Sequence, residues 1–418
     1  MGLVRHVLSY WYPELLATAS LENPATPLSE YDRDEKALIG IDVTEESALG
    51  VGAYFACLKV LGETMASMDL EVVEKVGKAT RVNTSHKNYW LLHAEPSPHY
   101  SRFEWVQAMV IWAASWGNGY SRIKRDRFAN AIELELLPSY LVTPKMNERG
   151  RLYYEYQNER GRIEVIMPDD IIHLKNIGTN GIVGMSTAQI QRETIGAALA
   201  KIQQEGSFYV NGAKASGVLM TPGTMGVKER SNVIDSFKKA TEGPQNRFKT
   251  ILLEEGVKYQ QLTIPQNDAQ FLESKKFDRT DICGWFRMPP HKIGELQDAN
   301  YSNIESQDRS FAKDVAVPWA TRFQQELDRK LFFQGERGRF MTQFNLDDLI
   351  KGDIKTRYEV YGMAIDHGML RPTEPREAEG WPMENTDEID QFFMNSTMKP
   401  VKQIVAEAAN PSPQQPDN

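Results

Sequence analysis

One apolar stripe in the C-terminal half of the chain limits the possible fold more than any other sequence feature. At a spacing of seven residues and then of four, it comprises Ile304, Phe311, Val315, Trp319, Phe323, Leu327 and Leu331. This spacing places the side chains on one face of a helix, which we predict over 304–335. Pro318 lies inside it and lacks the amide hydrogen of a helical hydrogen bond. The sequence therefore predicts a long amphipathic helix with a kink at Pro318.

Helical and strand-like segments alternate through the rest of the chain. The apolar run from Glu46 and the segment 102–116 predict helices. A capping pattern of Ser186 and Gln189 opens another, which runs to about 212, and one more is expected over about 268–287 until Pro289 and Pro290 stop it. Short strand-like runs separated by turns occur at 70–76, 120–126, 132–138, 140–146, 152–157 and 162–168. This mixture predicts an α+β fold.

The composition excludes several classes of protein. The 418 residues include 48 Lys and Arg against 57 Asp and Glu, a net charge of −9, which argues against a tight, static nucleic-acid binder. With 41% hydrophobic residues the chain can bury a core. Cys57 and Cys283 cannot form a disulfide framework or a cysteine zinc site, and we interpret them as buried free thiols in a reducing compartment. No run approaches the roughly 18 apolar residues of a membrane span, so we expect a soluble intracellular protein with no membrane partner.

Catalytic and metal-binding patterns are weak. The seven histidines contain no pair at the helical spacing of a zinc site, and there is no G-x-S-x-G elbow. The glycine-rich segment 178–184 lacks the Lys that would reach a phosphate. Asp169 and Asp170 could hold a magnesium ion, but two acidic residues at such a place more often mark an exposed turn. We therefore expect no catalytic residue, cofactor or metal. The alternative is a DNA- or nucleotide-processing enzyme that uses Asp169 and Asp170 or the 178–184 loop.

The order of several motifs resembles one known family. These include AYFACLKVLGETMASMDLEV from Ala53, GIVGMSTAQIQRETIGAALA from Gly181 and DAQFLESKKFDRTDICGWFRMPPHKIGELQDANYSNIESQDRSF from Asp268. In this order the chain resembles the portal proteins of tailed bacteriophages, in the family common among long-tailed phages and prophages. The resemblance covers about residues 50–380. A gene-transfer-agent portal or another connector component is compatible with the same motifs.

The resemblance implies an architecture for this sequence. An N-terminal arm (1–45) would precede a wing made of 46–185 and the long helix 304–335. Two stem helices (186–212 and 263–290) would flank a clip (213–262), and a tunnel loop (291–303) would follow. A crown (336–395) and a disordered tail (396–418) would complete the chain.

The resemblance also implies a biological role. Twelve chains would form a ring at one capsid vertex, with double-stranded DNA passing through its channel during packaging and ejection. The ring would have no ATPase activity. It would contact the major capsid protein or scaffold, the terminase large subunit and later a head-completion or adaptor protein. It would reside in the virion and, during assembly, in the host cytoplasm.

Three groups of residues carry these functional expectations. The tunnel loop would present Glu295, Leu296, Gln297, Asp298, Ala299, Asn300, Tyr301, Ser302 and Asn303, which include no cation and so would not grip passing DNA. The clip has eight basic and five acidic residues, a net charge of +3, and would face the terminase through Lys228, Arg230, Lys238, Lys239, Arg247 and Lys249. The basic residues of the two stem helices could touch DNA transiently, but we favour ion pairs between them and neighbouring acidic residues. The basic residues are Lys201, Lys275, Lys276 and Arg279, and the acidic residues are Glu205, Glu273 and Asp278.

Overall fold

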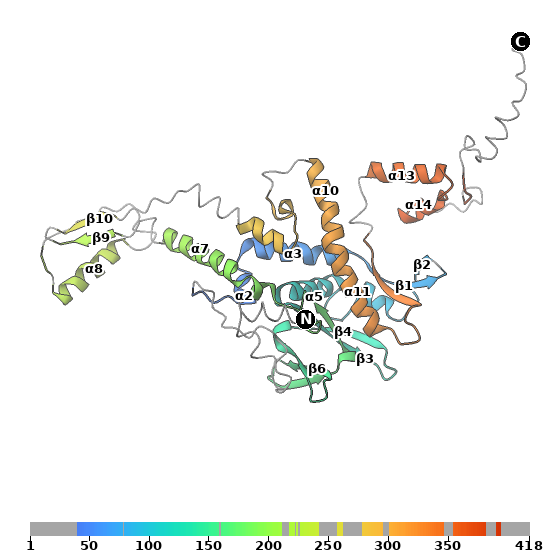
Figure 1. The fold of residues 1–418 in the computed structure, drawn as a ribbon, viewed down its shortest axis with the longest axis horizontal. Helices are drawn as coiled ribbons and strands as arrows, with labels where there is room; N and C mark the ends of the chain where they lie inside the picture. The colour runs from blue at the N-terminus through green and yellow to red at the C-terminus, as the bar shows by residue number, and fades with distance from the viewer. Residues whose placement is uncertain are drawn as a thin grey trace, which may run out of the picture. The chain divides into compact units, whose positions relative to one another are not determined.

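A computed structural model gives the three-dimensional structure of the chain (Figure 1). It describes residues 40–77, 79–158, 160–210, 217–221, 223–224, 226–241, 257–261, 278–295, 301–346, 354–381 and 390–393. Contacts divide the chain into two compact units, Met1–Leu346 and Asp347–Asn418. The predicted tail and nearly all of the predicted N-terminal arm lie outside the described residues.

A helical layer forms the centre of the first unit. It contains α2 (Glu45–Ala48), α3 (Gly52–Ser67), α4 (Tyr89–His93) and α5 (Arg102–Trp116). Helix α5 begins at a capping box in which Ser101 and Glu104 satisfy each other's backbone amides, and it ends at Gly117, whose φ of 85° suits glycine. Helices α3 and α5 pack so closely at Gly62 that a Cβ atom there would lie only 2.9 Å from Ile111 Cγ1. The helix predicted over 102–116 is confirmed.

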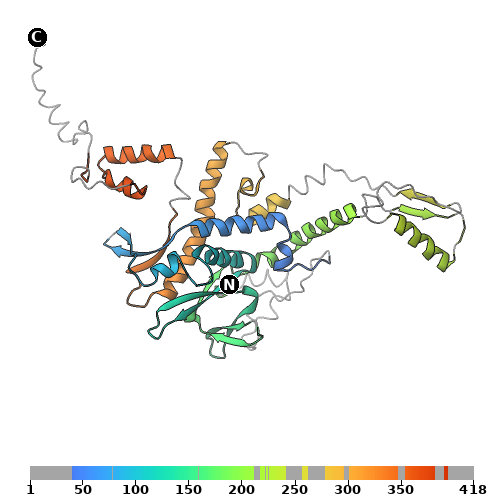
Figure 2. The same ribbon diagram turned by 180° about the vertical axis from the view of Figure 1, so that it is seen from behind.

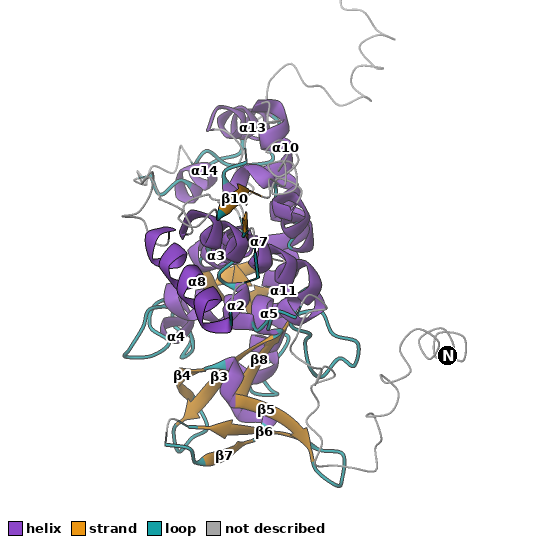
Figure 3. Ribbon diagram, turned by 90° about the vertical axis from the view of Figure 1, so that its left-hand side faces the viewer, coloured by secondary structure: helices purple, strands orange, loops and turns teal. Residues whose placement is uncertain are grey.

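Three antiparallel sheets of three strands accompany these helices. The first has the order β11-β1-β2, the second β4-β3-β8 and the third β5-β6-β7. Their strands are β1 (Leu70–Val76), β2 (Ala79–Val82), β3 (Asn118–Arg125), β4 (Ala131–Leu137), β5 (Val142–Met146), β6 (Leu152–Gln157), β7 (Ile163–Ile166), β8 (Ile171–Lys175) and β11 (Phe340–Phe344). Strands β3 to β8 lie together on one side of α3, α5 and α11 (Figure 3). Tyr120, Leu137 and Tyr154 belong to a core cluster shared by the second and third sheets.

The long predicted helix is present as three consecutive segments. Helix α10 (Tyr301–Phe311) continues through a π-helical segment, Ala312–Ala316, into α11 (Val317–Leu331). The orange ribbon runs on without interruption in both views (Figures 1 and 2). The π-helical segment ends at Ala316, two residues before Pro318, whose ring would clash with the carbonyl of Asp314 in a regular α-helix. The helix is thus irregular beside Pro318, and the bend itself stays a prediction.

The apolar stripe of this helix is largely buried. Phe311, Val315, Phe323, Leu327 and Leu331 are each at most 4% exposed. Helix α11 contacts β8 and β11, which belong to two different sheets. The stripe therefore joins elements that are far apart in the sequence, as its regular spacing required.

Several predicted boundaries differ from the structure. The helix predicted over 186–212 is divided at Gln191 into α6 (Thr187–Ile190) and α7 (Arg192–Val210). The predicted crown began at residue 336, but β11 pairs with β1, so that Leu70 opposes Phe344. This pairing keeps the chain up to Leu346 in the first unit, whereas the division into wing and crown stays a prediction. Helix α4 and strands β2, β8 and β11 were not among the predicted elements.

The insert and the second unit are described separately. In the insert, β9 (Gly217–Met220) pairs antiparallel with β10 (Lys258–Gln261), and α8 spans Val227–Thr241. The second unit contains α13 (Ile354–Asp366) and α14 (Thr373–Ala378). Within it, Arg357 Nε lies 2.8 Å from Glu379 Oε1, which ties α13 to the end of α14.

Candidate functional site

The predicted tunnel loop leaves the stem through a short, well-defined turn. Met288 and Pro289 lead into a 3-10 helix, Pro290–Ile293, which ends at Gly294 with a φ of 86°. Glu295 is described, whereas Leu296, Gln297, Asp298, Ala299 and Asn300 lie outside the described residues. Tyr301, Ser302 and Asn303 begin α10, and their side chains are also outside the description. The loop's contact with DNA therefore stays a prediction, but its attachment to the fold can be described.

One end of the loop is fixed to α10 by charged and polar contacts. His291 Nδ1 lies 3.0 Å from Gln307 Oε1, and His291 Nε2 lies 3.0 Å from Asp308 Oδ1. Lys292 Nζ lies 2.8 Å from the same Asp308 oxygen. Burial opposes ionisation of Asp308, but the hydrogen bonds from Lys292 and His291 outweigh it, so the pKa of Asp308 lies below its ordinary value. Asp308 is thus a charged anchor for the first residues of the predicted tunnel loop.

The same end is also fixed to the second stem helix. Arg279 belongs to the helical segment 278–285. Its Nη1 atom lies 3.2 Å from Glu295 Oε2, and its Nη2 atom donates a hydrogen bond to the carbonyl oxygen of Ile293. The side chain of Glu295 is only 17% exposed. Glu295 was predicted to face the channel, whereas here its carboxylate is paired with Arg279. We call these contacts, together with those of His291 and Lys292 to α10, the loop-base contacts.

The two predicted stem segments are joined to each other by an ion pair. Lys201 Nζ of α7 lies 2.5 Å from Asp278 Oδ2 of the segment 278–285. The predicted pairing of Lys201 with an acidic neighbour is therefore confirmed. Lys275, Lys276 and Glu273 lie outside the described residues.

The second stem helix ends in a left-handed turn. Met288 N donates to Cys283 O at 2.8 Å and Arg287 N donates to Gly284 O at 3.1 Å, which is the Schellman pattern. Arg287 has a φ of 50°, a conformation that non-glycine residues rarely adopt. The two prolines that follow prevent the helix from continuing, as predicted.

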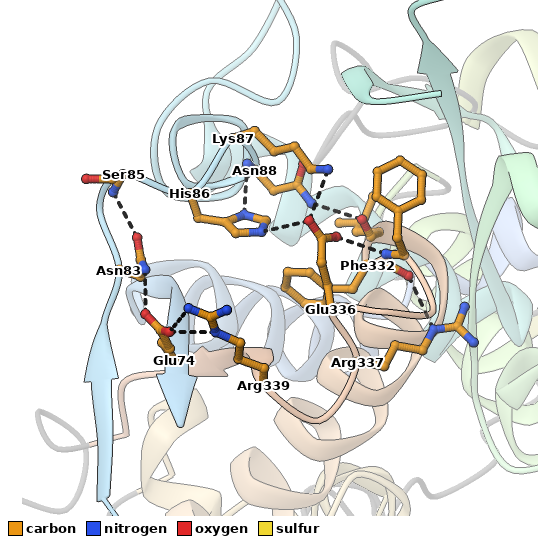
Figure 4. Close-up of polar contacts among 12 residues, drawn as sticks. Glu74, Asn83, Ser85, His86, Lys87, Asn88, Phe332, Glu336, Arg337 and Arg339 are labelled. Carbon is orange, nitrogen blue, oxygen red and sulfur yellow. Dashed lines mark hydrogen bonds and ion pairs between the residues drawn. The ribbon is translucent and has the colours of Figure 1, made fainter. Parts of the chain in front are cut away.

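The other end of the long helix is held by residues that precede α4 (Figure 4). Asn88 Nδ2 donates to the carbonyl of Leu331 at 3.0 Å and so satisfies one of the last carbonyls of α11. Lys87 Nζ lies 3.2 Å from Glu336 Oε1, and Glu336 Oε2 accepts the Phe333 amide at 3.0 Å. These contacts fix the turn in which α11 gives way to β11.

The first sheet contributes to the same network (Figure 4). Glu74 of β1 lies 2.7 Å from Arg339 Nη2 and accepts from Asn83 Nδ2 at 2.9 Å. His86 Nε2 is buried and 3.9 Å from Glu336 Oε1, beyond hydrogen-bond range. Burial lowers the pKa of His86, although the Glu336 carboxylate opposes this. The network connects the end of α11 to the first sheet.

The glycine-rich segment 178–184 does not form a phosphate-binding loop. Asn180 Oδ1 accepts the amides of Ile182 and Val183, and Asn118 Oδ1 accepts the amide of Gly184 at 2.7 Å. The last three amides of the segment are thus already hydrogen-bonded within the fold and are not available to a phosphate. Glycine at 184 has a packing reason, because a Cβ there would lie 2.0 Å from the carbonyl oxygen of Gly117.

Asp169 and Asp170 lie in a turn, as the non-catalytic interpretation of these two residues predicted. They lie in a 3-10 turn before β8, and Asp170 Oδ1 is 3.0 Å from Arg125 Nε. The backbone carbonyl of Asp169 accepts from the same guanidinium. In the part of the chain that the structure describes, no three acidic, histidine or cysteine side chains gather as a metal site would require. None of the described helices is long and apolar enough to cross a membrane.

The predicted clip cations are described only in part. Lys228 and Arg230 are exposed near the start of α8. Lys238 and Lys239 belong to α8 but their side chains lie outside the description, as do Arg247 and Lys249 altogether. The basic face of the clip therefore stays a prediction.

Comparison with known proteins decides the family. A family model described as phage portal protein matches residues 52–380. The chain belongs to the phage portal protein family. It is 28% identical over 364 residues to a probable portal protein of Streptomyces phage phiC31, covering 84% of this chain and 79% of that protein. It is 26% identical over 345 residues to the portal protein of Enterobacteria phage HK97, covering 81% of each.

Solved structures share the portal fold. The neck of a native gene transfer agent particle, computed with C12 symmetry, matches with a TM-score of 0.58 and 22% identity, over 86% of this chain and 96% of that one. An HK97-family phage portal protein from Corynebacterium diphtheriae matches with a TM-score of 0.56 and 12% identity, over 74% of this chain and 99% of that one. The predicted resemblance and the α+β fold are both confirmed.

Proposed function

We propose that this portal protein assembles as a ring of twelve chains at one capsid vertex and conducts double-stranded DNA during packaging and ejection. The observation that carries the proposal is the family match over 52–380, combined with a fold like that of a particle neck computed with C12 symmetry. A closed ring needs a heterologous interface, in which one face of a chain meets a different face of its neighbour. Twelve chains of 47.6 kDa give a particle of about 570 kDa.

The proposed partners follow from the same assignment. In the virion the ring contacts the major capsid protein or scaffold, and the clip receives first the terminase large subunit and then a head-completion or adaptor protein. The net positive charge of 213–262 supports a partner with an acidic surface, because opposite charges steer association. During assembly the ring resides in the host cytoplasm.

The loop-base contacts support passage of DNA without tight binding. Each cation that neutralises a phosphate adds salt-sensitive affinity, so a conduit lined with free cations would retard DNA. The sequence from Glu295 to Asn303 contains no Lys or Arg. Lys292, which precedes this segment, is paired with Asp308, and Arg279 of the stem helix is paired with Glu295. Their charges are therefore compensated before a phosphate could reach them.

A charge-insertion experiment tests this account of the channel. Asn300→Lys adds twelve positive charges to the proposed ring, and Asn300→Gln is the matched neutral control. We expect both variants to assemble, but the Lys variant should package DNA several-fold more slowly, with the deficit shrinking as salt is raised. Packaging by the Lys variant at the rate of the Gln variant in low salt would contradict the proposal.

We propose that the ring is a structural component and not an enzyme, in keeping with its family. The amides of residues 182–184 are hydrogen-bonded within the fold, and Asp170 is paired with Arg125. Incubation of the purified protein with ATP or DNA and magnesium provides the check. Turnover that disappears in an Asp169→Asn, Asp170→Asn double variant would reinstate the enzyme alternative.

A further inference from the structure

The second unit exposes much apolar surface for its size. Its exposed large apolar side chains are Tyr358, Val360, Met363, Met369, Trp381, Phe392 and Phe393. Within the described stretches 357–381 and 390–393, no residue is buried. Two helices of 13 and 6 residues need an apolar core to form a stable unit. We therefore expect another segment to cover part of this surface.

One face of α13 is apolar and is not used by α14, which lies beside it (Figures 1 and 2). Arg357 and Tyr361 of α13 both contact the carboxylate of Glu379, directly after α14. Consecutive residues are about 100° apart around a helix, so Met363 lies about 200° from Tyr361 and points away from that contact. Val360, three residues earlier, lies on the same side as Met363. The side chains of Val360 and Met363 are 52% and 56% exposed, and we call them the free face of α13.

The last described residues of the chain are held near the C-terminal end of α13. Arg371, five residues after that helix, has its Nη1 atom 3.1 Å from Asp390 Oδ2. Thr373 Oγ1 donates to Asp390 Oδ1 at 2.8 Å. The guanidinium of Arg371 also lies 4.8 Å from the centre of the Phe392 ring. Residues 394–418 therefore continue from a point close to the free face.

The sequence that follows carries the pattern of a short amphipathic helix. Apolar residues recur at intervals of three, one and three, which places them on one helical face. They are Val401, Ile404, Val405 and Ala408. Pro400 precedes them, where its fixed φ suits a first helical turn, and Pro411 would stop the helix. A helix of about ten residues is marginal alone in water, so it needs an apolar partner.

We propose that residues 400–409 form an amphipathic helix that docks on the free face of α13 in the same chain. The docked helix completes the second unit as a packed group of three helices. The family resemblance placed these residues in a disordered tail, and the proposal replaces that expectation for 400–409. The docking does not depend on ring assembly or on DNA passage.

The length of the connection favours docking within one chain. Residues 394–399 span at most about 20 Å, and connections of two to eight residues usually join antiparallel helices. Helix α13 is about 20 Å long, so a helix of about 15 Å that starts near its C-terminal end can run back along it. The short connection also gives the helix a high effective concentration at its own α13, which a separate chain lacks.

Hydrogen exchange of the full-length protein, followed by mass spectrometry, tests the docking. In wild type, the amides of 402–409 should exchange roughly ten-fold more slowly than those of 412–418. Met363→Asp and Ile404→Asp should each abolish this protection. The controls are Met363→Leu, which keeps the free face apolar, and Gln403→Asp, which adds the same charge on the polar face of the docked helix; both should retain it. Equal exchange of the two segments in wild type, or unchanged protection in Met363→Asp, would overturn the proposal.

Crosslinking shows which chain supplies the helix. Met363→Cys combined with Ile404→Cys is treated with a short bismaleimide, and the products are separated on a denaturing gel and analysed as peptides. The native Cys57 and Cys283 are 0% and 2% exposed, and peptide analysis distinguishes their products from the intended one. We expect a crosslink within one chain, formed several-fold faster than in the control that carries Gln403→Cys in place of Ile404→Cys. Crosslinks that join separate chains would overturn the proposal, because a second copy would then cover the free face.

Discussion

Asn118 is the residue whose removal should most directly weaken the junction between the sheets and the stem. It lies on β3, is 8% exposed, and makes three hydrogen bonds. Its Oδ1 accepts from Gly184 N at 2.7 Å and from His173 Nε2 at 2.8 Å, and its Nδ2 donates to Gly184 O at 2.9 Å. These bonds fix the 178–184 loop, which leads into α6 and α7.

The cost of Asn118→Ala can be worked out from these three bonds. The substitution leaves the amide and carbonyl of Gly184 and one His173 nitrogen without partners. Each buried polar group that loses its partner costs about 1–3 kcal/mol, so the loss is about 3 kcal/mol if water satisfies part of the demand. For a domain of 150–250 residues 1 kcal/mol corresponds to a Tm shift of about 2–4 °C, and a larger unit shifts less. We therefore expect Tm to fall by about 5 °C.

Differential scanning calorimetry of wild type and variant at one protein concentration provides the assay. Asn147→Ala is the control, because Asn147 accepts two amides in an exposed hairpin turn where water can replace it. That control should lower Tm by no more than about 2 °C. If Asn118→Ala had the same Tm as the Asn147→Ala control, the assignment of the loop's stability to Asn118 would be refuted.

Three further predictions follow from the same contacts. Burial holds the pKa of His173 well below its ordinary value, so the unfolded chain binds a proton at a higher pH than the folded chain does. The free energy of unfolding should therefore fall as the pH drops below about 6.5. Calorimetry at pH 7.5 and 5.5 should show a larger fall in Tm for wild type than for His173→Gln. Asp308→Asn removes the charged anchor of the loop-base contacts. Because Asp308 is partly exposed, the free energy of unfolding should change by less than about 1 kcal/mol. The rate of DNA packaging should fall several-fold, and an unchanged rate would contradict the role of the anchor. Pro318→Ala restores a helical amide beside the π-helical segment and should impair packaging more than ring formation, as measured by packaged DNA per assembled ring; normal packaging would count against a functional bend.

The sequence predicts those parts of the fold that local patterns determine. The stripe from Phe311 to Leu331 repeats at helical spacing, so the long helix could be recognised without knowledge of its partners. Strands such as β6 and β7 are flanked by turn residues and were recognised in the same way. Strand β11 was missed because its place depends on pairing with β1, from which it is separated by more than two hundred and fifty residues. No local pattern encodes such a contact.

The candidate site shows the same division. The sequence predicted the helix stop at the two prolines, the polar loop after them and the pairing of Lys201 with an acidic neighbour. The contact of Lys292 with Asp308 was not predicted, although Asp308 lies two helical turns after the start of α10 and Lys292 is the second residue after the Pro-Pro stop. A charged pair that flanks a loop on both sides is a signal that could have been used.

Negative-stain electron microscopy of the purified full-length protein, with native mass measurement on the same sample, tests the central claim most directly. We predict annular particles with twelve-fold symmetry, a central hole and a mass of about 570 kDa. Particles that stay monomeric under every assembly condition, or that form open filaments in place of closed rings, would contradict the account.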